Sequence, residues 1–303
     1  MDLKRGRIYV VVISPSDFVR IIRPHQWTKN LLILAPPFFG AVLFFDKHLI
    51  INMAVAFFAF SFASSSGYMI NDLFDIKTDR LHPQKKHRPI PSGRVGTTHV
   101  LVLVALMLCL SLALSLTLGL QFILLILLYL SISLLYSLYL QHVPILDAFS
   151  ISSGFVIRIG AGGNASGIEI SSWLYLTTFL LSLLLAFGKR RYELSTLENS
   201  GDFRKVLSDY STGFLDSATG IFATISIVTY SLYTVDRGPK SFILTVPFAC
   251  YGVLRYLYLV QSRQSGDPTE ALLSDKWLFL CVFLWIVLTA LIVYFPDFFR
   301  FFF

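Results

Sequence analysis

Long apolar runs, separated by short charged or Gly/Pro-rich breaks, recur along the whole chain. A run of about 20 apolar residues is the length that an α-helix needs to cross a bilayer. The pattern therefore predicts an all-α, polytopic membrane protein with nine transmembrane helices. The expected spans are 31–45, 49–70, 98–118, 120–139, 143–162, 171–188, 214–235, 241–261 and 277–296. The first is short and contains Pro36 and Pro37, so we expect it to be kinked.

Composition agrees with a lipid-facing surface. Of the 303 residues, 55% are hydrophobic and 14% are charged, whereas soluble chains are on average about 25% charged. Nine spans leave no room for a large soluble domain, so residues 1–303 are expected to form one integral membrane domain. The three cysteines lie inside apolar runs without the spacing of a metal or disulfide framework, and we interpret them as packing residues.

The distribution of Lys and Arg predicts the orientation in the membrane. The segments on the side of the N-terminus carry 19 of the 25 basic residues and the opposite segments carry four. Basic residues are enriched on the cytoplasmic side, so we expect a cytoplasmic N-terminus and an outer C-terminus in the plasma (inner) membrane. The basic inner segments are 1–30, 71–97, 189–213 and 262–276. Nucleic-acid binding is not expected, because these residues flank spans and form no separate module.

Three aspartates follow the second predicted span at a helical spacing. On a continuous helix Asp72, Asp75 and Asp79 would fall within about 60° of one another. Crowded carboxylates destabilise a helix unless a cation joins them. Mg²⁺ is such a cation, held by one or two carboxylates together with water and substrate phosphates. The spacing therefore predicts a magnesium site in which all three aspartates are metal ligands and catalytic residues.

A dense run of cations follows the aspartates within the same inner segment. Carboxylates for magnesium beside cationic donors are the two halves of a diphosphate site, because a leaving diphosphate needs both. A solvated, positive-inside loop would explain the cations alone but not the aspartate spacing. The residues expected to bind the leaving group are Arg80, Lys85, Lys86 and Arg88.

These motifs resemble those of a known family. The string Asn71-Asp72-x-x-Asp75-x-x-x-Asp79 resembles the first aspartate-rich motif of the UbiA superfamily of intramembrane prenyltransferases, whose members have nine transmembrane helices. Longer strings are similar to its decaprenyl-phosphate phosphoribosyltransferase branch: 23–30, 79–83 running into 88–90, 154–162, 188–194 and 266–270. The resemblance implies magnesium-dependent transfer of phosphoribose from phosphoribosyl diphosphate to a polyprenyl phosphate. The products would be a lipid-linked ribose phosphate and diphosphate.

The segment after the sixth predicted span departs from the superfamily, which usually has a second run of aspartates there. This chain instead has the string Lys189-Arg190-Arg191-Tyr192-Glu193, with Asp202 and Asp209 further on. A second cluster of cations suits a substrate with phosphates at both ends, so we expect Lys189, Arg190 and Arg191 to hold the sugar's other phosphate, beside Tyr192 and Glu193. An ordinary positive-inside boundary is the alternative. The roles of Glu193, Asp202 and Asp209 are left open.

Four other residues are expected at the substrate site. Arg23 and Lys29 precede the first span in a basic segment and are interpreted as phosphate donors, the alternative being an interfacial helix anchored by Trp27. Asn71 belongs to the motif above. Asp147, near the inner end of the fifth span, is assigned to the mouth of the site, with a capping role as the alternative.

Arg158 and Arg255 are the two basic residues inside predicted spans. Ionisable residues at membrane depth usually face a cavity or a partner. Arg158 could anchor a lipid phosphate or pair with an acid, and we favour a structural role for it. We favour the same role for Arg255, which lies among tyrosines.

Two other functions remain compatible with the sequence. In a UbiA-type prenyltransferase, a polyprenyl diphosphate would ionise on the same magnesium site and an aromatic or quinone-precursor acceptor would attack it. A membrane transporter is the alternative outside the enzymes. The spans lack the many buried ionisable residues of a relay, and the acids cluster at one end and not at the midplane, so a transporter is disfavoured.

Overall fold

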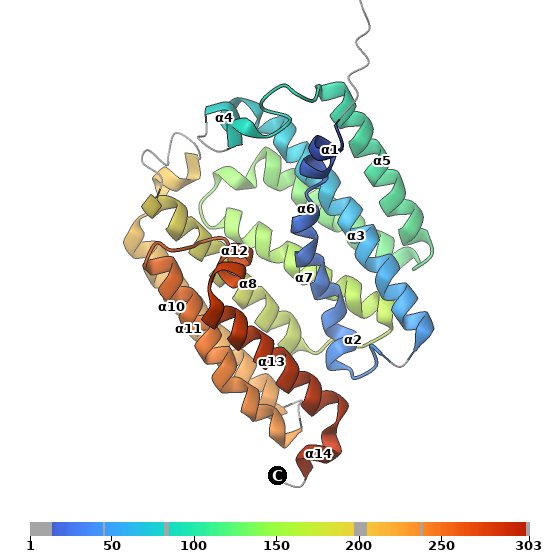
Figure 1. The fold of residues 1–303 in the computed structure, drawn as a ribbon, viewed down its shortest axis with the longest axis vertical. Helices are drawn as coiled ribbons and strands as arrows, with labels where there is room; N and C mark the ends of the chain where they lie inside the picture. The colour runs from blue at the N-terminus through green and yellow to red at the C-terminus, as the bar shows by residue number, and fades with distance from the viewer. Residues whose placement is uncertain (1–13, 45, 82–84, 197–204, 237–238, 301–303) are drawn as a thin grey trace, which may run out of the picture.

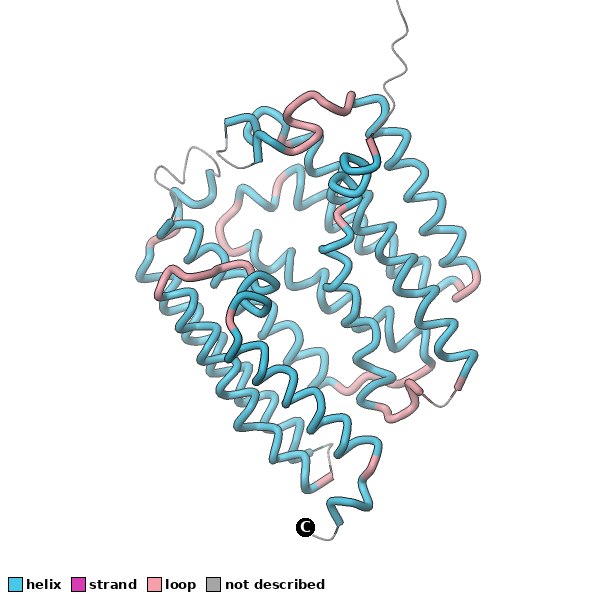
Figure 2. Tube along the Cα trace, viewed as in Figure 1, coloured by secondary structure: helices cyan, strands magenta, loops and turns pink. Residues whose placement is uncertain are grey.

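The fold is a bundle of long helices, known here from a computed structural model that describes residues 14–44, 46–81, 85–196, 205–236 and 239–300. Figure 2 shows the described chain as helices joined by short loops, with no strand in these ranges. The all-α class predicted from the apolar runs is therefore confirmed.

The long helices alternate in direction along the bundle, and shorter ones cap its ends (Figure 1). The long helices are α3 (Lys47–Phe74), α5 (Thr97–Leu116), α6 (Leu120–Leu138), α7 (Leu146–Ser166), α8 (Ser172–Thr196), α10 (Thr212–Asp236), α11 (Val246–Gln261) and α13 (Lys276–Tyr294). The short α-helices are α1 (Pro15–Ile22), α2 (Ala35–Phe39), α4 (Ile76–Leu81), α12 (Pro268–Ser274) and α14 (Pro296–Arg300). The 3₁₀ segments are η1 (Pro24–Leu34), η2 (Lys85–His87), η3 (Leu140–His142), η4 (Lys205–Asp209) and η5 (Lys240–Thr245).

Seven helices of the described chain are long and apolar enough to span a bilayer, so the count of nine is not confirmed. Helix η5 joins α11 in one of the seven, and the other six are α3, α5, α6, α8, α10 and α13. The predicted span 31–45 is broken into η1 and α2, and Pro36 and Pro37 lie in the first turn of α2, where a missing N–H costs least. The predicted span 143–162 is α7, a 21-residue helix with a buried Asp147 and a buried Arg158.

Helix α7 lies at the centre of the bundle. It packs against α6, α8, α3 and η1, whereas α3 also packs on α5, and α8 also packs on α10. Gly162 permits the contact with η1, because a Cβ at this position would lie 2.1 Å from the carbonyl oxygen of Ile33. Leucine, isoleucine and phenylalanine side chains are exposed on the outer faces of α5, α6 and α13, as expected of helices that contact lipid.

One end of the bundle gathers the segments predicted to lie on the inner side. The hydroxyl of Ser137 in α6 donates to Asn71 Oδ1 at the end of α3, at 2.9 Å. Lys189 at the end of α8 donates to Asp267 beside α12, also at 2.9 Å. Described parts of the segments 71–97, 140–142, 189–213 and 262–276 therefore meet at one end of the bundle, where a common site can form.

Candidate active site

Arg23 joins α1 to η1 in a backbone conformation that few residues other than glycine adopt, with φ 56° and ψ 58°. Such strain costs roughly 1–3 kcal/mol and is often retained where function requires it. Here it directs the guanidinium at the end of α3, where Nη2 donates to both carboxylate oxygens of Asp72. The predicted phosphate donor Arg23 is thus paired with a predicted metal ligand.

Asp72 and Asp79 converge on a single cation. Arg88 Nη1 lies 3.3 Å from Asp72 Oδ1 and 3.0 Å from Asp79 Oδ2, and Lys85 Nζ lies 3.5 Å from the other oxygen of Asp79. Both carboxylates are buried, at 4% and 3% exposure. Two buried carboxylates directed at one point form an oxygen-rich cation site, so this pair fits a magnesium ion.

Asp75 takes a different direction from its two neighbours. Helix α3 ends at Phe74, and Asp75 is its C-cap residue with φ −88° and ψ 4°, so the continuous helix face expected from the spacing is interrupted. Its carboxylate instead accepts from Asn71 Nδ2 at 2.7 Å and from Gln141 Nε2 at 3.3 Å. Within the described residues no three acidic, His or Cys side chains are grouped closely enough to share a metal ion. The geometry supports two of the three predicted ligands as a pair.

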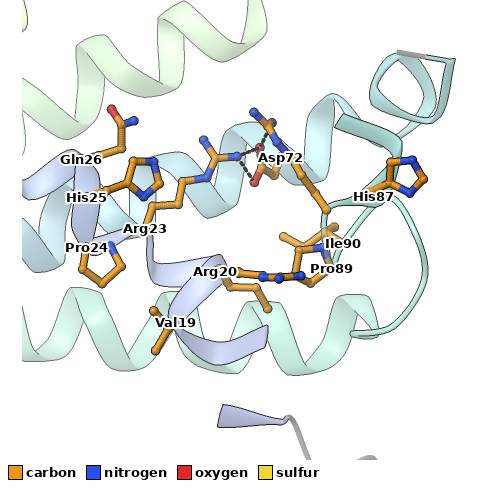
Figure 3. A pocket seen from close by; sticks show the side chains of 12 residues that line it. Val19, Arg20, Arg23, Pro24, His25, Gln26, Asp72, His87, Pro89 and Ile90 are labelled. Atoms are coloured by element: carbon orange, nitrogen blue, oxygen red, sulfur yellow. Dashed lines mark hydrogen bonds and ion pairs between the residues drawn. The ribbon is translucent and has the colours of Figure 1, made fainter. Parts of the chain in front are cut away.

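An open pocket of about 520 Å³ lies beside Asp72 (Figure 3). Residues of α1 and η1 line one side, and the segment after η2 lines the other. Arg20, Arg23 and His25, which Figure 3 labels, line it together with Arg88. Burial first, and then the positive charge of Arg23, lowers the pKa of His25, so the imidazole adds no charge of its own at neutral pH. Three arginines line this pocket and two of them, Arg23 and Arg88, contact Asp72, so the pocket suits a polyanionic ligand such as a diphosphate.

The other predicted members of this basic segment take different positions. Arg80 donates through Nε to the carbonyl of Pro91 at 3.0 Å, which holds the loop in shape. Lys86 is exposed. His82 and Pro83, part of a string on which the resemblance rests, lie outside the described residues.

Lys189, Arg190 and Arg191 do not converge, contrary to the expectation that they hold one phosphate together. Successive side chains of a helix point about 100° apart. Lys189 therefore meets Asp267, Arg190 meets Asp147 in α7, and Arg191 meets Asp216 in α10 at 2.7 Å.

Arg190 and Asp147 form a sealed ion pair. Arg190 Nε lies 2.6 Å from Asp147 Oδ2, and both side chains are almost fully buried. The hydroxyl of Tyr210 donates to the other oxygen of Asp147, and Glu193 accepts from Arg190 at 3.0 Å. These bonds join α7 to α8. Both carboxylate oxygens of Asp147, the residue assigned to the mouth of the site, are therefore bonded to neighbouring side chains. Asp202, by contrast, lies outside the described residues.

Lys29 lies deep in the bundle but keeps part of its surface accessible, as a side chain that lines a cavity does. Burial, and then the charge of Lys189, lowers its pKa to about 8. Asp267 opposes this shift. Lys29 and Lys189 therefore share one electrostatic environment, although they are 160 residues apart in the chain.

Arg158 anchors η1 against α7. Its Nε donates to Asn30 Oδ1 at 2.7 Å, and its guanidinium lies 4.8 Å from the ring centroid of Tyr129. Asn30 in turn donates to Ser61 of α3 at 3.0 Å. These contacts fit the structural role favoured for Arg158, and Arg255 likewise pairs with Asp275 at 2.7 Å.

Asp267 is the residue at this end that sequence reasoning missed. Its string, 266–270, carried the resemblance but was given no role. The Asp-Pro pair is a helix N-cap signal, and Asp267 does cap α12, but no sequence signal indicates that the carboxylate faces Lys189.

Comparisons with known proteins agree with the family resemblance found in the sequence. The sequence model of the UbiA prenyltransferase family matches residues 33–280. A decaprenyl-phosphate phosphoribosyltransferase of Corynebacterium glutamicum is 35% identical over 290 residues, covering 92% of this chain and 87% of that protein. One from Mycolicibacterium smegmatis is 34% identical over 297 residues, covering 92% and 93%. A solved UbiA homologue from Archaeoglobus fulgidus, bound to GPP and Mg²⁺, has a similar fold with a TM-score of 0.72 at 19% identity, covering 92% of this chain and 99% of that one.

Proposed function

Because the chain belongs to the UbiA prenyltransferase family, we propose that this membrane transferase moves 5-phosphoribose from phosphoribosyl diphosphate to a polyprenyl phosphate and releases diphosphate. The observation that carries the proposal is the identity of 34–35%, over nine-tenths of the chain, to proteins named decaprenyl-phosphate phosphoribosyltransferase. The basic pocket beside Asp72 supports it, because the donor carries a diphosphate at one end.

Asp72 and Asp79 would hold magnesium, which lowers the charge on the departing diphosphate. Arg23 and Arg88 now neutralise these carboxylates. If both acids held the metal, the two guanidinium groups would be available to the diphosphate oxygens, which are stronger acceptors than water. Asp75 keeps Asn71 oriented at the end of α3. The residues of this end therefore bind and orient the donor.

The chemical step needs positioning and charge stabilisation more than acid–base catalysis. Loss of diphosphate from the anomeric carbon passes through an oxocarbenium-like transition state, so stabilising the leaving group and holding the acceptor nearby provide most of the rate. The lipid phosphate is already anionic and needs little base. Lys29 and Lys189, two partly accessible cations outside the lining of the Asp72 pocket, are proposed to bind the remaining phosphate groups.

A second candidate is prenyl transfer from a polyprenyl diphosphate to an aromatic acceptor. The bound GPP and Mg²⁺ of the Archaeoglobus fulgidus homologue favour it, although the likeness at 19% identity concerns the fold. Purified protein with magnesium should be offered labelled phosphoribosyl diphosphate plus polyprenyl phosphate, or polyprenyl diphosphate plus 4-hydroxybenzoate. Product from the first pair alone supports phosphoribosyl transfer, and product from the second pair alone overturns it.

The orientation is also part of the proposal. The bias of 19 inner against four outer basic residues supports a cytoplasmic site in the inner membrane, with the C-terminus outside. The C-terminal residues 301–303 lie outside the described residues. Cysteines introduced at positions 2 and 302 should be labelled from opposite sides of the membrane. Labelling from the same side would contradict the orientation.

A further inference from the structure

Asp267 is a carboxylate held rigidly among cations. It caps α12 by accepting from the amide of Thr269 at 3.0 Å, and its other oxygen lies 2.9 Å from Lys189 Nζ. The preceding Gly266 is pressed against α8, where a Cβ would lie 2.1 Å from the Cβ of Tyr192. The hydroxyl of Tyr256 donates to the carbonyl of Gly266 at 3.2 Å. The loop between α11 and α12 therefore fixes the carboxylate in one place.

Asp267 contacts a residue that is proposed to bind substrate, since it pairs with Lys189. Burial alone would raise the pKa of Asp267, but Lys189 and Lys29 outweigh burial and hold the pKa below its usual value. The charge of Asp267 also reaches His25, a residue of the pocket beside Asp72. The side chain of Asp267 is 29% exposed and that of Lys189 is 39% exposed, so a ligand can reach both.

A negative charge at this position requires an explanation. Both proposed substrates are polyanions, and a carboxylate repels them. Capping α12 does not require the charge, because serine, threonine or asparagine caps a helix as well. Lys189 would also attract a phosphate more strongly without a carboxylate beside it. An ionised carboxylate can only accept hydrogen bonds, so a ligand that presents hydrogen-bond donors there would account for the charge.

The hydroxyl groups of the donor's ribose meet this requirement. Fully ionised phosphoribosyl diphosphate has no other hydrogen-bond donors, and ionised polyprenyl phosphate and polyprenyl diphosphate have none. Resting on the function proposed above, we propose that Asp267 accepts a hydrogen bond from a ribose hydroxyl and thereby selects the sugar diphosphate over a polyprenyl diphosphate. The diphosphate then lies toward Arg23 and Arg88, and the ribose lies toward Asp267.

Binding of deoxy analogues tests this selection. The full chain in detergent with magnesium is titrated with phosphoribosyl diphosphate, with its 2-deoxy and 3-deoxy analogues, and with inorganic diphosphate. Wild type should bind at least one deoxy analogue roughly 10-fold more weakly than the parent sugar, the size expected for a hydrogen bond to a charged group. In Asp267→Ser, which keeps a cap, the parent sugar should bind roughly 10-fold more weakly and this difference should disappear. Inorganic diphosphate should bind Asp267→Ser at least as tightly as wild type, because a repulsive charge is gone.

The chain offers a matched control in Asp275. Asp275 caps α13 by accepting from the amide of Leu278 and pairs with Arg255, so it has the same two structural roles as Asp267. Asp275 is not among the charged groups that shift the pKa of Lys29 or of His25. Asp275→Ser should bind every ligand as wild type does.

The outcomes distinguish a failure of the inference about Asp267 from a failure of the proposed function. If Asp267→Ser still discriminates against the deoxy analogue, or loses inorganic diphosphate as much as it loses the sugar, Asp267 is structural and the inference is overturned. Asp267→Thr, which also keeps a cap with a shorter side chain, repeats the test should the serine variant not fold. If wild type does not bind phosphoribosyl diphosphate, the proposed function fails instead.

Discussion

The inner end of the bundle contains two arginine–aspartate clusters built from the same chemistry. Arg88 bridges Asp72 and Asp79 beside an open pocket, and its side chain is 36% exposed. Arg190 meets Asp147 between α7 and α8, where its side chain is 2% exposed. The first guanidinium can exchange its carboxylates for other ligands, whereas the second is enclosed by protein. Access therefore separates the proposed site from the enclosed pair, although their sequence signals are alike.

The largest effect on turnover should appear when an acid of the exposed Arg88 cluster loses its charge. Asp72→Asn should lower turnover by orders of magnitude and leave the protein folded, because the amide keeps the shape but removes charge that magnesium needs. Turnover with magnesium and with excess chelator, beside a thermal unfolding curve in detergent, measures both properties. Equal activity in chelator and in magnesium would contradict the assignment.

Breaking the sealed pair should instead reduce stability. Arg190→Ala leaves Asp147 buried without its cation, and removal of one partner of a buried ion pair costs about 3–5 kcal/mol. Arg191→Ala is the control on the next residue and should cost less, because its partner Asp216 is 40% exposed and can be solvated when the arginine is removed. Unfolding in detergent should separate the two variants. Similar midpoints would mean that the Arg190–Asp147 pair is not structural.

Lys189 is expected to bind substrate, as Arg88 is. Lys189→Ala should raise the Michaelis constant for the sugar donor by about 10- to 100-fold, the equivalent of one charge-assisted contact at roughly 1.5–3 kcal/mol. The Michaelis constant for the lipid should change less, and Arg191→Ala should change neither. If Lys189→Ala weakens only the use of lipid, Lys189 does not bind the donor.

The pH dependence of substrate affinity tests whether Lys29 belongs to the phosphate site. Its pKa of about 8 lies below the ordinary value of 10.5, so the folded protein loses this charge as the pH rises through 8. A bound anion favours the protonated amine, and substrate affinity should therefore fall between pH 8 and pH 10. Lys29→Arg, which stays charged, should show a flatter profile of kcat/KM over this range. An unchanged profile would remove Lys29 from the phosphate site.

The fold class was predictable because apolar runs report helices directly. The structure of residues 31–45 was less predictable, because the run of apolar residues does not show that η1 and α2 are separate segments. Asp72 lies in α3 and Asp79 in α4, and the two meet at Arg88, whereas Asp75 lies at the break between these helices and accepts from Asn71. Neighbours in the string 189–191 look like one cluster, yet their partners Asp267, Asp147 and Asp216 come from three other parts of the chain. Local spacing cannot indicate such long-range partners.

The central claim is that Asp72 and Asp79, and not Asp75, form the cation site on which donor cleavage depends. Phosphoribosyl transfer to polyprenyl phosphate should be measured with magnesium for Asp79→Asn and Asp75→Asn, each shown to be folded by thermal unfolding. We predict that Asp79→Asn loses activity by orders of magnitude. Asp75→Asn should keep most of it, because its one amide oxygen can still accept from Asn71, the shorter of the two bonds that Asp75 makes. A folded Asp75→Asn as inactive as Asp79→Asn would contradict the claim.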